Sequence, residues 1–230
     1  MPNFAPLPPA MEPMPTHWQN RFLHRLMLAT LINQMENRLL AENSATHTLE
    51  HWLRAHALLG PHETLRAERE STAQRTCPPD LLAALELPDP GSAHALHYRK
   101  IRLTAHNRTY SEAENWFVPA RLTKTMTQAL EQTDTPFGRV VSPLRFTRQL
   151  IRRETLWSPL PDLWEMQPQP EGSKMGAEPL PLPPHLFRHI ALLRTHAGIP
   201  FSLVVETYTP QAFAFGPPGQ CHTPHRNGPQ

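Results

Sequence analysis

The placement of 28 prolines restricts this chain more than any other feature of its sequence. Proline fixes φ and has no amide hydrogen, so it is excluded from helix interiors and from central strands. Six prolines lie in residues 1–16 and eight lie in residues 158–184. We therefore expect a disordered leader over 1–16, a disordered tail over 216–230, and one domain over 17–215. Within that domain, 158–184 is predicted to be an inserted surface loop without a core of its own.

The charge and the apolar content argue against several classes of partner. Lys and Arg number 22 and Asp and Glu number 20, so the chain lacks the strongly basic balance of nucleic-acid binders. No apolar run approaches the ~20 residues that span a bilayer, and residues 1–16 contain no signal-peptide pattern. Cys77 and Cys221 are too isolated to form a disulfide framework, which favours a reducing compartment. We expect a cytoplasmic monomer with no nucleic-acid or membrane partner.

The first quarter of the domain is predicted to be helical. Apolar residues recur at helical spacing over 18–40. Asn43 or Ser44 can cap a second helix over about 45–59, because both side chains accept hydrogen bonds from free amides of a first turn. A short strand can follow over 63–71.

A hairpin is predicted in the middle of the chain. Residues 97–103 alternate polar and apolar side chains, as a half-buried strand does. In this alternation Arg99 and Ile101 share one face of the sheet. Asn107-Arg108 would turn the chain into a second strand that runs through 116–118.

The second half of the chain mixes helices and strands. Pro119 can open a helix that runs to residue 130, and Ser142-Pro143 has the cap and first-turn proline of another helix. Two strands are predicted over 187–193 and 201–209, joined by a short turn. The predicted fold class is therefore α+β, with helices packed on an antiparallel sheet.

No familiar catalytic motif stands out. The chain has no GxSxG segment and no glycine-rich phosphate loop. Its 14 histidines form three close groups, namely His47 with His51, His185 with His189, and Cys221 with His222 and His225. A zinc site needs three or four ligands and none of these groups has the accompanying base of an HExxH motif, so we expect solvated histidines and no metal.

Arg99 and Glu206 are the charged residues on predicted strands that best suit a binding site. A buried charge is costly unless it meets a partner, so an inward Arg or Glu favours the binding of a charged small molecule. The alternation of a strand does not say which face is wet. From the pattern alone, both residues can equally face solvent at the margin of the sheet.

The order of several short segments resembles bacterial chorismate lyase. The matching segments are Tyr98-Arg99-Lys100-Ile101, Trp116-Phe117-Val118-Pro119, Thr135-Pro136-Phe137-Gly138-Arg139, Leu144-Arg145-Phe146-Thr147-Arg148, Leu156-Trp157, and Gly198-Ile199-Pro200 followed by Glu206 and Pro210. They cover residues from about 44 to 210. The resemblance implies a chorismate lyase-like fold, an antiparallel sheet with helices packed on it and an enclosed ligand site.

The resemblance also implies a role for five residues. Arg99 matches an arginine that grips the ring carboxylate, and Glu206 matches a glutamate at the hydroxyl end of the product. Phe137 and Ala45 match positions whose backbone N–H groups bind the ligand. Arg139 either receives a second carboxylate or stabilises its turn.

The implied activity is that of a cofactor-free chorismate lyase, which converts chorismate into 4-hydroxybenzoate and pyruvate. Its only partners would be this substrate and this product, and it needs no metal, flavin or nucleotide. The chain departs from the family where Ser158-Pro159 opens the insertion and where Val205 replaces a threonine before Glu206. A non-catalytic protein of the same fold that binds or senses an aromatic carboxylate is therefore the alternative.

Overall fold

The computed structural model describes residues 17–70, 75–87, 95–166 and 178–217. The predicted leader and all but the start of the predicted tail lie outside these ranges. Within them, six strands form one antiparallel sheet in the order β1-β2-β3-β6-β5-β4. The strands are β1 (Arg66–Arg69), β2 (His97–Ala105), β3 (Arg108–Phe117), β4 (Thr147–Thr155), β5 (Phe187–Arg194) and β6 (Pro200–Tyr208).

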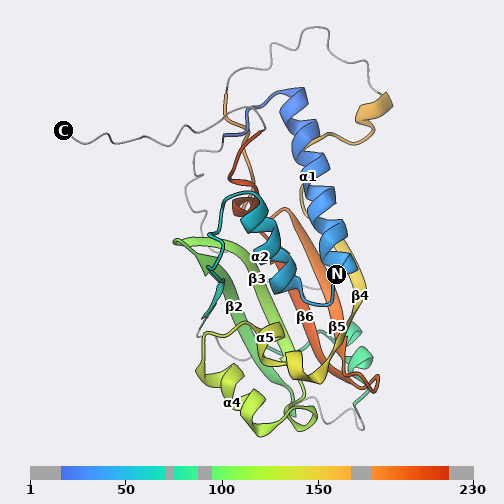
Figure 1. Ribbon diagram of the computed structural model, residues 1–230. Helices are drawn as coiled ribbons and strands as arrows, with labels where there is room; N and C mark the ends of the chain where they lie inside the picture. Colours follow the sequence, from blue (N-terminus) through green and yellow to red (C-terminus); the bar gives the residue numbers. More distant parts are fainter. Residues whose placement is uncertain (1–16, 71–74, 88–94, 167–177, 218–230) are drawn as a thin grey trace, which may run out of the picture.

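The helices are distributed unequally over the two faces of this sheet. Figure 1 shows α1 and α2 lying across one face, with α5 beside the lower end of α2. The α-helices are α1 (Phe22–Ala41), α2 (Ala45–Ala55), α3 (Pro79–Leu82), α4 (Lys124–Gln132) and α5 (Phe137–Val140). Short 3-10 turns are η1 (Ala83–Leu85), η3 (Pro119–Arg121), η4 (Ser142–Leu144), η5 (Trp164–Met166) and η6 (Pro210–Phe213). In the described part of the chain, no helix has the length and apolar character of a membrane span.

Two apolar cores follow from this arrangement. The larger core joins α1 and α2 to the inner face of the sheet through residues such as Leu28, Leu49 and Val204. The smaller core lies on the opposite face, where Leu81 and Leu85 pack against Trp116. The α+β prediction is confirmed, with helices packed on an antiparallel sheet.

One predicted helix starts later than expected, and another is only a 3-10 turn. The segment that begins at Pro119 forms only η3, and α4 starts later, where the Thr123 hydroxyl accepts a hydrogen bond from the Met126 amide. Ser142-Pro143 likewise opens only η4, and the chain then enters β4. The sequence pattern did not predict β4 because most of its side chains are exposed, so polar and apolar residues do not alternate along it.

The hairpin of β2 and β3 turns one residue earlier than predicted. His106 and Asn107 form the turn, and both have positive φ values, 51° and 58°. The register then shifts between Leu103 and Thr104. As a result Arg99 lies directly opposite Asn115 on the neighbouring strand.

Helix α1 is tied to the sheet by a buried carboxylate as well as by apolar packing. Glu36, only 2% exposed, accepts hydrogen bonds from Nε and Nη2 of Arg153 at 2.8 and 2.6 Å. Its Oε1 also lies 3.3 Å from Nε2 of His189, a fully buried side chain on β5. This ion pair has two donors from two strands, so it fixes the position of α1 along the sheet.

The expectation of a coreless loop over 158–184 is wrong for its described residues. Leu180 is 1% exposed and belongs to the larger core, and its amide donates to the Trp18 carbonyl. Proline excludes regular helix and strand from this segment, but it does not prevent isolated leucines from packing. The segment therefore contributes to the stability of the domain.

We predict that Leu180→Ala lowers the free energy of unfolding by about 2–4 kcal/mol, because it removes a fully buried leucine and leaves a cavity. Met166→Ala in the same segment is the control, since Met166 is 78% exposed, and its effect should stay within about 0.5 kcal/mol. Urea unfolding followed by tryptophan fluorescence measures both. Equal effects of the two substitutions would contradict the packing of Leu180.

Candidate functional site

A cavity of about 40 Å³ lies between the inner face of the sheet and the segment that joins α1 to α2. Its floor is made by β2, β3, β5 and β6, and its cover by the 43–46 segment, Leu49 and the start of α5. The lining residues with polar side chains are Asn43, Ser44, Thr46, Ser111, Asn115, Arg148, Glu206 and Tyr208. The apolar ones include Leu49, Ile101, Leu103, Phe137, Phe146, Leu193 and Val204. This space holds about three water molecules, so a larger ligand requires the cover to move.

The strand register explains why charged residues from distant segments converge here. Arg99 opposes Asn115, and Asn115 opposes Val204, so these three side chains share the inner face. Glu206 is two residues beyond Val204 and therefore lies on the same face. With two strand spacings and two residues between them, the Cα atoms of Arg99 and Glu206 are roughly 12 Å apart.

Arg99 lies beside the cavity rather than in its lining. It is 3% exposed, and its Nη2 donates to the carbonyls of Thr133 and Thr135 at 3.1 and 3.0 Å. Its Nε and Nη1 are buried and have no hydrogen-bond partner among the described residues. Burial lowers the pKa of Arg99 to about 10, with the nearby charge of Arg69 acting in the same direction. The side chain is therefore still a cation at neutral pH.

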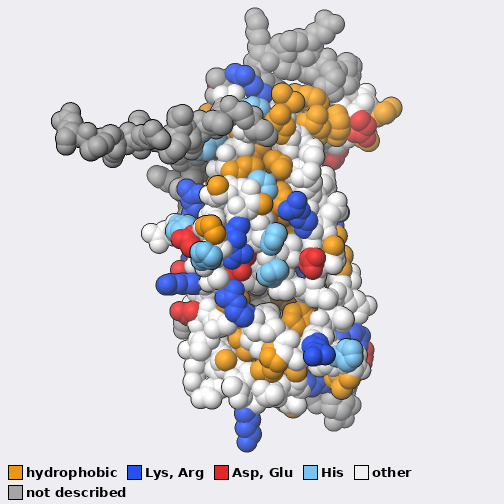
Figure 2. Space-filling view, in the orientation of Figure 1, with side chains coloured by type: hydrophobic (Ala, Val, Ile, Leu, Met, Phe, Trp, Pro, Cys, Tyr) orange, Lys and Arg blue, Asp and Glu red, His pale blue; other side chains and the backbone are white. Residues whose placement is uncertain are grey.

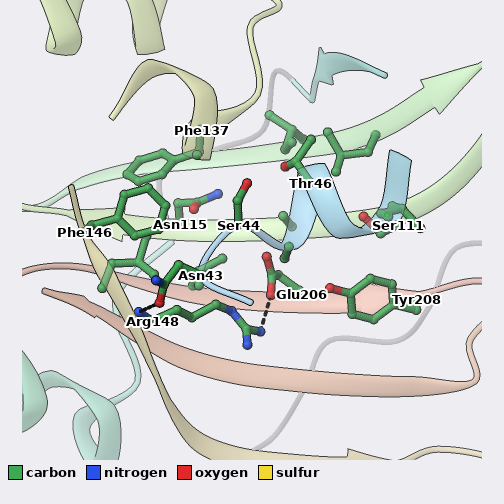
Figure 3. Close-up of a pocket in the computed structure, with 18 residues that line it drawn as sticks. Asn43, Ser44, Thr46, Ser111, Asn115, Phe137, Phe146, Arg148, Glu206 and Tyr208 are labelled. Atoms are coloured by element: carbon green, nitrogen blue, oxygen red, sulfur yellow. Dashed lines mark hydrogen bonds and ion pairs between the residues drawn. The ribbon is translucent and has the colours of Figure 1, made fainter. Parts of the chain in front are cut away.

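Asn115 does line the cavity, and it is the most unusual polar group there. It is 1% exposed, and both the nitrogen and the oxygen of its amide are buried without a hydrogen-bond partner. A buried amide without partners costs free energy, and folded proteins seldom leave both atoms unpaired. Figure 3 shows this amide beside the Ser44 side chain, at the end of the cavity nearer Phe137.

Glu206 lines the cavity and forms a buried ion pair. Arg148 donates from Nη2 to Glu206 Oε2 at 2.6 Å, and the two side chains are 3% and 15% exposed. Burial lowers the pKa of Arg148, but the charge of Glu206, the neighbouring Tyr208 and the hydrogen bond to Glu206 together offset this, so that the pKa is raised overall. Arg148 also donates to the Leu39 carbonyl and, through its backbone amide, to Asn43. The pair therefore connects β4 and β6 to the cover of the cavity (Figure 3).

Tyr208 stands at the opposite end of the cavity from Phe137 and Phe146 (Figure 3). Its ring is fully buried, lies 5.8 Å from that of His189 and stacks on Phe187. Burial raises the pKa of its hydroxyl well above the usual value, and the charge of Glu206 raises it further. The hydroxyl is therefore a neutral hydrogen-bonding group at any physiological pH.

Of the other three predicted site residues, two line the cavity and one does not. Phe137 and Ala45 both line the cavity, and each is the first residue of a helix, where an amide N–H has no acceptor within the helix. Arg139 does not line it. Its Nη2 donates to Glu50 at 2.9 Å, and its side chain is 44% exposed, so it fits the turn-stabilising alternative.

Sequence reasoning missed Arg148 and Asn115. Arg148 belongs to a segment noted for the family resemblance, but its strand has no alternating pattern that would mark an inward side chain. Asn115 becomes visible as the neighbour of Arg99 only when the hairpin register is known.

The histidine groups do not assemble a metal site in the described part of the chain. His47 and His51 lie on the outer side of α2 with ring centroids 6.0 Å apart, and Figure 2 shows histidine and arginine or lysine side chains gathered over this region. His185 contacts Glu112 and His189 contacts Glu36. The group that contains Cys221 lies outside the described residues.

A protein of known sequence resembles this chain over most of its length. The uncharacterized protein y4mC of Sinorhizobium fredii (strain NBRC 101917 / NGR234) is 38% identical over 201 residues, which are 87% of this chain and 83% of that protein. No protein-family profile matches the chain.

Several solved structures overlap with part of the fold. The effector domain of PhnF from Mycobacterium smegmatis has a TM-score of 0.41 and 14% identity, over 73% of this chain and 88% of that domain. Complete PhnF gives 0.43 and 10%, over 73% of this chain and 64% of that one. YydK of Bacillus subtilis, described as a possible transcriptional regulator, gives 0.37 and 13%, over 64% of this chain and 59% of that one. The chain thus spans less than two thirds of the two longer proteins.

We predict that Arg148→Met lowers the free energy of unfolding by about 3 kcal/mol, because it leaves the Glu206 carboxylate buried without its partner. Adding Glu206→Gln to this variant should restore most of the loss, since the two neutral side chains need no ion pair. Arg152→Met is the control on the same strand, because its pairing with Asp80 is exposed and contributes at most about 1 kcal/mol. A double-mutant cycle measured by urea unfolding tests the prediction, and additive effects of Arg148→Met and Glu206→Gln would contradict it.

Proposed function

The chain belongs to the family of the uncharacterized protein y4mC, and we propose that it binds a small aromatic monocarboxylate in the cavity beside Arg99. The observation that carries this proposal is the state of Arg99. It is a buried cation with two nitrogen atoms that lack partners, next to a cavity lined by polar and apolar groups. An anion that completes these hydrogen bonds would offset the cost of burying the charge.

The charges around the cavity favour a ligand with a single negative charge. Arg148 and Glu206 are the charged residues of the lining, and they neutralise each other at 2.6 Å. Arg99 is in no ion pair among the described residues, although the charges of Arg69 and Asp134 both act on it, so it is a cation that can take one anion. A monoanion matches this balance. A dianion would need a second cation, and Arg139 lies outside the cavity, where it is paired with Glu50.

The apolar walls of the cavity favour a ligand that has a flat apolar ring between its polar groups. Phe137, Phe146 and Leu49 face the cavity from above, and Ile101 and Val204 form part of its floor. Aromatic rings pack well between such surfaces and lose little conformational entropy on binding. Glu206 and Tyr208 lie where a hydroxyl group at the far end of the ring would find hydrogen-bond partners.

We predict that the purified protein binds 4-hydroxybenzoate and that Arg99→Met weakens this binding by about 2–4 kcal/mol, because a buried charge-assisted contact is lost. Isothermal titration calorimetry measures the change. Arg102→Met is the matched control, since Arg102 lies on the same strand but is 44% exposed and points to the other face. Equal affinity of the two variants would show that Arg99 does not hold the ligand.

A second candidate function is the lyase activity that the sequence resemblance implies. The observation in its favour is that Glu206 lines the cavity on the same face of the sheet as Arg99, at a distance that one substituted ring can bridge. Chorismate has two carboxylates. Its second carboxylate would find a cation only if Arg148 exchanged Glu206 for the substrate, so turnover requires this ion pair to open.

We predict for this second candidate that the protein, without added metal, converts chorismate to 4-hydroxybenzoate with one pyruvate released per turnover, and that EDTA has no effect. Glu206→Gln should lower turnover more than affinity, because an amide cannot donate the proton that a carboxylic acid donates. Chromatography of the products together with a coupled pyruvate assay gives the answer. Tight binding of 4-hydroxybenzoate without any pyruvate release would support the binding function and contradict the lyase activity.

A further inference from the structure

We propose that Asn115 determines ligand specificity, by supplying the second donor to the bound carboxylate and by selecting ligands that carry an N–H or O–H donor next to that carboxylate. This inference rests on the proposed binding of an aromatic monocarboxylate. It adds a substrate class to that function, namely benzoates with an amino or hydroxyl group in the ortho position. It also assigns a role to the least satisfied polar group of the cavity.

Arg99 alone cannot hold both oxygens of a carboxylate. A guanidinium grips a carboxylate with two adjacent N–H groups, and both of the edges available for this include Nη2, because the Cδ atom blocks the edge between Nε and Nη1. Nη2 of Arg99 already donates to the carbonyls of Thr133 and Thr135. A two-pronged grip by Arg99 alone is therefore excluded while those bonds persist. One oxygen of the carboxylate can be bound by Nη1 or Nε, and the other needs a second donor.

Asn115 lies where it can supply the second donor. It is the direct cross-strand neighbour of Arg99, and side chains at such positions have Cβ atoms about 4.5–5.5 Å apart on the same face. Unlike Arg99, it lines the cavity itself. Its amide nitrogen is buried and has no acceptor among the described residues, so it is free to donate to the second carboxylate oxygen.

The amide oxygen of Asn115 is the group that selects the ligand. Once the nitrogen of Asn115 binds a carboxylate, the oxygen of the same amide lies beside that carboxylate and still needs a donor. The Phe137 ring offers no hydrogen to it, and the Ser44 hydroxyl, which lies beside this amide, makes no hydrogen bond to it. A donor on the ligand, one ring position away from the carboxylate, satisfies it. A ligand with a methyl group there leaves the oxygen buried and unpaired. Leaving a buried polar group unpaired discriminates between ligands more strongly than adding an apolar contact does.

The test compares three probes that differ only at the ortho position, namely 2-aminobenzoate, 2-methylbenzoate and benzoate. The amino and methyl groups have similar size, but only the amino group donates a hydrogen bond. We expect the parent protein to bind 2-aminobenzoate roughly tenfold more tightly than 2-methylbenzoate, by titration calorimetry. In Asn115→Leu, which keeps a similar shape, this ratio should fall to about one, and benzoate should bind more weakly than to the parent.

Asn33→Leu is the matched control, because Asn33 is exposed on α1 and lies outside the cavity. Its ratio of affinities should equal that of the parent. Asn115→Asp is a second variant that removes the donor and adds a negative charge, and it should weaken all three acids. Thermal unfolding of each variant shows that the fold is retained.

The outcomes separate this inference from the function on which it rests. If none of the three acids binds to the parent protein, the proposed binding function is wrong. If all bind through Arg99 with equal affinities for the amino and methyl probes, the binding function stands and the role of Asn115 is overturned. A tenfold preference for 2-aminobenzoate that persists in Asn115→Leu would also overturn the role of Asn115, because another residue would then accept the hydrogen bond of the amino group.

Discussion

The buried ion pair between Arg148 and Glu206 connects the edge and the middle of the sheet to the segment that covers the cavity. Glu206 comes from β6 in the middle of the sheet, and Arg148 comes from β4 at its edge. Arg148 further donates from its side chain to the Leu39 carbonyl near the end of α1 and from its backbone amide to the Asn43 side chain of the cover. Neither charge can be buried alone at acceptable cost, so the edge strand, the central strand and the end of α1 must come together in one arrangement.

The same ion pair decides what the cavity can bind. With Arg148 and Glu206 neutralising each other, Arg99 is the cation left to bind an anion, and it lies beside the cavity as the cross-strand neighbour of Asn115, which faces the end away from Tyr208. This separation gives the site one end for a carboxylate and one end for a neutral polar group. Binding of a monoanion requires only a movement of the cover, whereas binding of chorismate also requires the ion pair to open. The binding function therefore requires fewer changes in the structure than the lyase activity does.

A second buried carboxylate, that of Glu36, holds helix α1 in place next to the cover of the cavity. Glu36 is held by Arg153 and contacts His189, and His189 lies directly opposite Glu206 in the sheet. Helix α1 is thus anchored by polar bonds to β4 and β5, while the segment that follows it covers the cavity. We infer that opening involves residues 43–46 rather than the whole of α1, because moving the helix would leave Glu36 buried and unpaired.

The sequence by itself determined the elements whose side chains follow a regular period. The helical spacing before Leu40, the alternation around Arg99 and the apolar run before Glu206 are local patterns, and the corresponding helix and strands lie where these patterns predict. The antiparallel α+β fold follows from them. The order of short segments also pointed to Arg99 and Glu206, which lie on one face of the sheet.

Only the tertiary structure decided which residues meet. A register shift in the β2–β3 hairpin places Asn115 opposite Arg99, and a one-residue difference in the turn would have placed Trp116 there instead. The pairing of Arg148 with Glu206 depends on β4 joining the edge of the sheet, which no alternation along β4 reveals. Register and strand order depend on contacts between residues far apart in the chain, and local periodicity contains no information about them.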